Sequence, residues 1–196
     1  STAMAAANAE LYQEVQDKHD ECLSSAALSN NGYIFATQGD AFELVFPTIR
    51  DAVMFCLESQ EALLRTKWSA EALSLPSCGA QESRDGDQAP FAFAGPRVRM
   101  GIHAASLDAP VILADMAGNT SAWSLQQFTR SQDEAAGGRV VYNGPAVIMT
   151  RVLSDSAAGG QIVLSDTAAA MFGACRSAGT FAVLEDLGLF QFTDLT

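Results

Sequence analysis

Two short runs in which apolar residues recur at every second position flank a tight turn near residue 40. The alternating positions are Tyr33, Phe35, Thr37, Phe42, Leu44 and Phe46. A period of two is typical of a β-strand with one buried face, and Gln38-Gly39-Asp40 between the runs supplies turn-forming residues. The pattern predicts a β-hairpin over residues 33–46 with Asp40 at its exposed tip.

Segments with a helical period lie on both sides of this hairpin. We predict a helix over residues 8–29 with Asn8 as its N-cap, and a second helix from the cap Thr48 to about Thr66. The expected inner face of the first helix is Leu11, Val15, Cys22, Leu23 and Ala26. The expected inner face of the second helix is Val53, Cys56, Leu57, Gln60 and Leu64.

The rest of the chain mixes long loops with short elements. Residues from about 76 to 96 are rich in Gly and Pro, and residues 105–138 are polar and interrupted by turns, so both stretches are expected to be loops. Strands are predicted over 97–103, 161–164, 181–184 and 189–192, and helices over 144–154 and 165–172. This alternation indicates a mixed α/β (α+β) fold.

Composition narrows the class of protein. The 196 residues, of which 48% are hydrophobic, suffice for one sizeable core, so we expect a single domain over residues 8–196. Residues 1–7 are interpreted as a scar of expression cloning and a disordered start. A net charge of −12 argues against nucleic-acid partners and anionic membranes, because both bind basic protein surfaces.

Two further features bear on location and redox state. No apolar run approaches the roughly 20 residues of a bilayer span, so we expect a soluble, cytoplasmic domain without direct membrane contact. It would stand alone or form the intracellular part of a larger or membrane-bound protein. Cys22, Cys56, Cys78 and Cys175 lack metal-binding spacing, which favours buried reduced thiols over disulfides or zinc.

Several blocks follow one another in an order that matches a known family. They are Lys18-His19-Asp20-Glu21-Cys22-Leu23, Gly39-Asp40-Ala41-Phe42, the segment from Asp51 to Leu64, Arg97-Val98-Arg99-Met100-Gly101-Ile102-His103, Tyr142-Asn143-Gly144-Pro145, Gly159-Gly160-Gln161-Ile162 and Leu184-Glu185-Asp186-Leu187-Gly188. In this order they resemble the catalytic homology domain of class III adenylyl and guanylyl cyclases over most of residues 8–196.

The resemblance implies a fold and an assembly. The fold is a ferredoxin-like core with a central, mainly antiparallel sheet flanked by helices, here without a counterpart of the family's first strand. The partner is a second cyclase-type domain, identical or different, because sites of this family form across a dimer interface. In this family the region of residues 105–138 reaches toward the partner, with Trp123 and Phe128 as its anchors.

The resemblance also implies a chemistry. Active relatives convert ATP or GTP to a cyclic nucleotide and pyrophosphate, with two Mg²⁺ or Mn²⁺ ions held by two aspartates. Asp40 matches the second of these aspartates, and the first has no counterpart. On the local pattern alone, Asp40 is more simply a turn-former that bonds its own backbone.

Other site positions of the family carry different residues here. The lysine that selects adenine falls at Ala36, and its aspartate partner falls at Val141. The ribose asparagine and the transition-state arginine fall at Ile148 and Val152. Arg151 lies one residue early, which turns a helical side chain by about 100°, so an exposed or inter-subunit role competes with catalysis.

The remaining candidate positions are that of a family lysine and those of three basic residues of this chain. The phosphate-binding lysine of the family falls at Thr193. His103 is expected to be a hydrogen-bonded structural histidine rather than a catalytic base. Arg97 and Arg99 share a strand face and form either an anion site or, more simply, a solvated or interface pair.

These losses lead to two main hypotheses. The first is a degenerate cyclase domain that dimerises, regulates and is inactive as a homodimer. The alternative is an active nucleotide cyclase, or a metal-donating half-site that a partner chain completes. A nucleotide sensor without turnover is a third possibility, for which the sequence offers no identifiable phosphate contacts.

Overall fold

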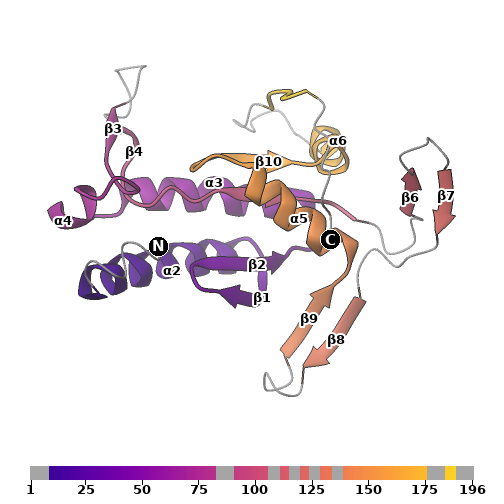
Figure 1. Ribbon diagram of the computed structural model, residues 1–196, viewed down its shortest axis with the longest axis horizontal. Helices are drawn as coiled ribbons and strands as arrows, with labels where there is room; N and C mark the ends of the chain where they lie inside the picture. The colour runs from indigo at the N-terminus through magenta and orange to yellow at the C-terminus, as the bar shows by residue number, and fades with distance from the viewer. Residues whose placement is uncertain are drawn as a thin grey trace. The chain divides into compact units, whose positions relative to one another are not determined.

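A computed structural model describes residues 9–82, 91–105, 111–114, 120–123, 129–133, 139–175 and 184–188 (Figure 1). They fall into two compact units, one of Ser1–Met100 with Ala158–Ile162 and the other of Gly101–Ala157 with Val163–Thr196. Helices and antiparallel strand pairs occur together, so the α+β class is confirmed. Among the described residues the strands form five two-stranded sheets.

The first unit is built on two long helices. They are α2 (Ala9–Ser29) and α3 (Ile49–Arg65), which pack against each other (Figure 1). The hairpin of β1 (Tyr33–Gln38) and β2 (Ala41–Val45) connects them along the chain. Both helices and the hairpin agree with the sequence prediction. α3 begins as expected, because the Asp51 N–H donates to Thr48 Oγ1 at 3.1 Å.

The core of this unit lies between α2, α3 and the hairpin. Burial of each large apolar side chain, such as Leu63 and Phe55, stabilises the unit by about 1.5–3 kcal/mol. Phe46 at the end of the hairpin lies 5.2 Å from Phe55, and Phe42 meets the His19 ring edge-on at 5.8 Å. These contacts hold the hairpin against both helices.

The predicted inner face of α3 was partly wrong. Val53 and Cys56 are buried as expected, together with Ala52, Phe55, Ser59 and Leu63. Leu57, Gln60 and Leu64 are only half-buried. The helix is rotated so that Leu63, which is 2% exposed, faces the core. The spacing of apolar residues permits either face, and packing against α2 selects one.

The stretch from residue 76 to 96 was predicted to be a loop and contains a strand pair. β3 (Gln81–Glu82) pairs with β4 (Phe91–Phe93), after the short helix α4 (Ala70–Leu73). Phe91 and Phe93 favour extended structure and overcome the turn-forming composition around them. Residues 83–90 lie outside the described part.

The second unit contains a further correction. Within the expected loop 105–138, β6 (Val111–Ala114) pairs with β7 (Thr120–Trp123). β8 (Thr129–Asp133) also lies in this loop and pairs with β9 (Arg139–Asn143), which directly follows it. The run of β-branched and aliphatic residues from Val111 to Leu113 explains the first pair. Of the two proposed anchors, Trp123 lies opposite Val111 in this ladder, and Phe128 lies outside the described residues.

The remaining elements follow the prediction more closely. α5 (Pro145–Ser156), β10 (Ile162–Leu164) and α6 (Asp166–Cys175) form where expected, and β5 covers only Met100–Ile102 of the predicted 97–103. β5 pairs with β10. Leu184 is described and lies outside any strand, while the rest of the expected last strands, 181–183 and 189–192, lies outside the described residues.

Candidate functional site

Asp40 stands at the tip of the β1–β2 hairpin. Gln38 pairs with Ala41, so Gly39 and Asp40 form a two-residue turn, and Gly39 has the positive φ of 62° that such turns require. The Asp40 side chain is exposed. The hairpin therefore presents this carboxylate to solvent, where a metal ion or a partner chain can reach it.

The fit of a metal to this site can be judged from its donors. A Mg²⁺ or Mn²⁺ pair shared by two aspartates needs several converging oxygen ligands. Across the described ranges no group of three or more His, Cys, Asp or Glu residues comes together, and Asp40 is a single exposed carboxylate. The described residues therefore offer Asp40 as a single carboxylate ligand, and no catalytic step through a metal follows from it.

The two base-recognition positions lie in strands. Ala36 is in β1 opposite Glu43 of β2, beside an irregularity in register that leaves Phe35 buried. Val141 is in β9 opposite Ser131 of β8. Methyl and isopropyl groups offer neither donors nor acceptors, so these two side chains cannot read the edge of a purine.

Helix α5 carries the ribose and transition-state positions. It begins with Pro145 in the first turn, after Gly144 with φ 124°. Ile148 is 39% exposed, and Arg151 one turn later is also exposed, whereas Val152 is half-buried. Ile148 and Arg151 therefore share the outer face of the helix, and the position that the resemblance assigns to arginine holds an apolar side chain.

Close backbone contact fixes α5 against β5. A Cβ on Gly101 would lie 2.5 Å from Ser154 N and 2.6 Å from Thr150 O, both on the α5 backbone. Only glycine allows this approach. Leu153, on the inner face of the helix, is buried at the same contact. The outer face with Ile148 and Arg151 is thereby held outward.

His103 has the structural partner that was expected. Its Nδ1 lies 2.9 Å from Ser165 Oγ, and Ser165 Oγ also accepts a hydrogen bond from the Ala168 N–H at the start of α6. The Ser165 hydroxyl proton is thus free to be donated to Nδ1 of a neutral imidazole. Burial lowers the pKa of His103. The helix that Ser165 caps was predicted from local signals, but the contact of Ser165 with His103, 62 residues away, has no local signal.

The arginines of the predicted strand are exposed, and the cysteines differ in burial. Arg97 is exposed, with its guanidinium carbon 5.3 Å from the centre of the Phe93 ring, and Arg99 is exposed as well. All four cysteines are free. Cys56 and Cys78 are buried as predicted, Cys22 is half-buried, and Cys175 was wrongly expected to be buried. Thr193 lies outside the described residues.

None of the described helices combines the length and the hydropathy that a bilayer span requires.

Comparison with known proteins shows the family. The chain matches no protein-family model. It is 30% identical over 147 residues to an adenylate cyclase of Podospora anserina, and 32% identical over 147 residues to an adenylate cyclase of Mycosarcoma maydis. Each match covers 75% of this chain, and the chain spans 6% and 5% of the length of these two relatives.

A solved structure shows the same fold. An adenylate cyclase of Trypanosoma brucei, determined in its monomeric state, superposes with a TM-score of 0.61 over 86% of this chain and 69% of that one, at 22% identity. The order of sequence blocks, the two fungal relatives and this fold agree with one another. The chain therefore belongs to the class III nucleotidyl cyclase family, as a cyclase homology domain.

Proposed function

We propose that this domain is a regulatory member of the family, which pairs with another cyclase-type domain in cyclic-nucleotide signalling and makes no product as a homodimer. The observation that carries the proposal is chemical. Four positions that need polar or charged groups hold Ala36, Val141, Ile148 and Val152. Loss of one such group commonly reduces turnover by about 10²–10³, and several losses together leave little catalysis.

The geometry of α5 supports this proposal. Pro145 and the contact with Gly101 determine where the helix starts and which face is turned outward. Ile148 and Arg151 occupy the outer face. An exposed isoleucine beside an arginine suits contact with a second protein domain better than orientation of a ribose hydroxyl. We place this domain in the cytoplasm as part of a larger protein.

A second candidate function rests on Asp40. The hairpin tip exposes one carboxylate at the position of a family metal ligand. A partner domain that supplies the base, ribose and phosphate contacts, together with a second carboxylate, would complete a composite site with Mg²⁺ or Mn²⁺ and ATP or GTP. In that case this chain contributes a metal-binding half-site.

One experiment separates the two. The purified chain is assayed with ATP and with GTP, each with Mg²⁺ and Mn²⁺, while light scattering gives its mass. The regulatory proposal predicts no cyclic nucleotide from the chain alone, and ordinary turnover by the homodimer would overturn it. The assay is then repeated with an active cyclase domain added.

Matched variants identify the source of any product in the mixture. Asp40→Ala removes the hairpin carboxylate, and Asp17→Ala removes an exposed carboxylate on α2. Product that depends on Asp40 but not on Asp17 would establish the half-site. A change in the partner's turnover that both variants retain would support regulation without a metal contribution.

A further inference from the structure

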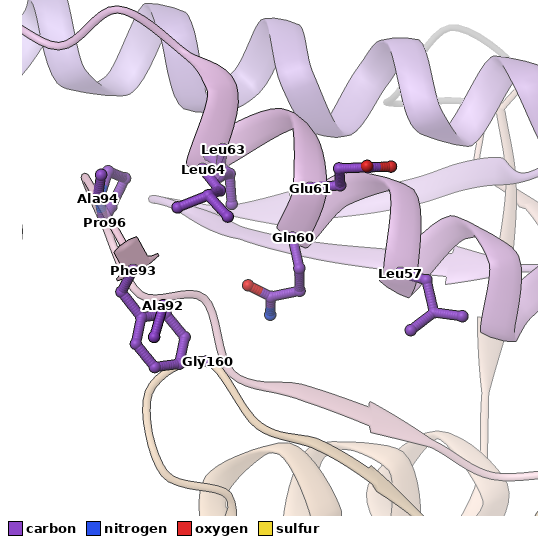
Figure 2. Close-up of a pocket in the computed structure, with 10 residues that line it drawn as sticks. All are labelled: Leu57, Gln60, Glu61, Leu63, Leu64, Ala92, Phe93, Ala94, Pro96 and Gly160. Carbon is purple, nitrogen blue, oxygen red and sulfur yellow. The ribbon is translucent and has the colours of Figure 1, made fainter. Parts of the chain in front are cut away.

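A pocket lies entirely within the first unit, between the outer face of α3 and residues 92–96. Its volume is about 320 Å³, and Gly160 closes one side (Figure 2). The α3 wall includes Leu57, Gln60 and Leu64, whose burial was mispredicted, and it also contains Glu61 and Leu63. α3 therefore has two apolar faces, one packed into the core and one left half-open beside the extended segment.

Gln60 is the polar group at the centre of this wall. Figure 2 shows its side chain extending from α3 toward the segment that carries Ala92 and Phe93. Its Nε2 donates to the Val98 carbonyl at 2.7 Å. Because a carbonyl can only accept, this bond fixes the orientation of the amide. The described residues provide no bond to Oε1, and one N–H of Nε2 also remains available.

Phe93 forms the opposite wall and is held in place. Gly160 has φ 87°, and a Cβ there would lie 2.2 Å from Cε1 of the Phe93 ring, so the ring rests directly on the glycine. The Arg97 guanidinium lies over the same ring. A fixed aromatic ring next to small side chains such as Ala92 and Ala94 provides an apolar wall against which the edge of a second ring can pack.

Size and charge restrict the ligand. A cavity of about 150 Å³ holds benzene, so about 320 Å³ accommodates a fused two-ring system. Among the described lining residues only Glu61 is charged, and its carboxylate is paired with Arg65 at 2.6 Å. The lining residues themselves therefore offer no cation to a phosphate; Arg97 lies against the Phe93 ring and Arg65 is paired with Glu61.

We propose that this pocket binds a flat, uncharged aromatic molecule that carries a hydrogen-bond donor and an acceptor side by side, as in an aromatic lactam. The Gln60 Oε1 accepts from the ligand N–H, the free N–H of Gln60 donates to the ligand carbonyl, and the ligand ring packs against the Phe93 side of the pocket. This proposal concerns a site separate from Asp40 and does not depend on cyclase activity.

The test is an NMR titration of the full chain with quinolin-2-one as the probe. Saturable amide shifts confined to residues 57–64 and 92–98 are expected. Quinoline, which lacks the adjacent donor and acceptor, should bind about tenfold more weakly, as expected when such a hydrogen-bonded pair is lost. Equal binding of both probes, or no saturable shifts in these segments, would overturn the proposal.

Variants distinguish the contribution of the Gln60 amide from that of the pocket volume. Gln60→Leu keeps the size of the side chain and should weaken quinolin-2-one about tenfold. Ala92→Phe places a ring at an exposed lining position and should abolish binding without touching the amide. Gln13→Leu, on the exposed face of α2, is the matched control and should bind like the wild type. Wild-type affinity in folded Gln60→Leu would contradict the role of Gln60.

Discussion

The contact between Gly101 and α5 leads to a prediction with a definite sign. Replacing Gly101 by Ala places a Cβ 2.5 Å from Ser154 N and 2.6 Å from Thr150 O. Both atoms belong to the helix backbone and cannot move aside as a flexible side chain would. The helix must therefore shift outward, or the strand must bend, before the methyl group fits.

The expected size of the effect follows from two opposing terms. Overpacking of this kind typically destabilises by about 1–3 kcal/mol. A Gly→Ala change also restricts the unfolded chain, which stabilises by about 0.4–1 kcal/mol. With both terms taken at the middle of their ranges, the net loss in the free energy of unfolding should be about 1.3 kcal/mol, within outer bounds of about 0–2.6 kcal/mol. For a chain of this length, a loss of about 1.3 kcal/mol lowers Tm by roughly 3–5 °C.

Thermal unfolding followed by circular dichroism measures the effect. Gly173→Ala is the matched control, because a Cβ on Gly173 meets nothing within 4 Å and the residue lies inside the exposed face of α6. It should raise stability by about 0.5–1 kcal/mol through helix propensity. If Gly101→Ala proved as stable as the wild type, the close packing of α5 on β5 would be refuted.

Three further predictions concern a cap, a titration and the thiols. Thr48→Ala should lower stability by about 1 kcal/mol in a urea titration, because Asp51 N loses its acceptor at the start of α3, and an unchanged midpoint would contradict the cap. Burial lowers the pKa of His103 in the folded chain below its value in the unfolded chain. The stabilising contribution of neutral His103 is therefore complete above about pH 6.5 and is lost as the pH falls from there through the lower folded pKa. Tm measured from pH 7.5 to 5 should accordingly fall less in His103→Asn than in the wild type. Exposed Cys175 should be the first thiol to react with a thiol reagent. Cys56 should react only when the protein unfolds, because its thiol is buried and burial raises its pKa to about 12. The kinetics of modification with and without urea will show this order.

Much of the first unit was predictable from local patterns. The period of two around Gly39-Asp40 predicted the hairpin, and Thr48 as a capping residue predicted the start of α3. Each of these signals depends on residues only a few positions apart, so the chain need not be folded for the pattern to be visible. The position of Asp40 at a solvent-exposed turn followed directly from them.

The candidate site was predictable as a set of residues and not as an arrangement. The resemblance located Ala36, Val141, Ile148 and Val152 in the chain, and their apolar character is a property of the sequence. Their exposure was not predictable. The outward direction of Ile148 depends on Gly101, which lies more than 40 residues earlier and allows α5 to approach β5.

Tertiary packing decided the rest. The apolar spacing of α3 allowed Leu57 and Leu64 to face inward, whereas in the folded unit, where α2 packs on α3, Leu63 is buried and the first two line a pocket. The contact of His103 with Ser165 likewise joins residues that are distant in the chain. Periodicity and capping involve residues within one or two turns of each other, so they can be recognised in the sequence. The choice between two apolar faces of a helix depends instead on which surfaces fit together when the chain is folded.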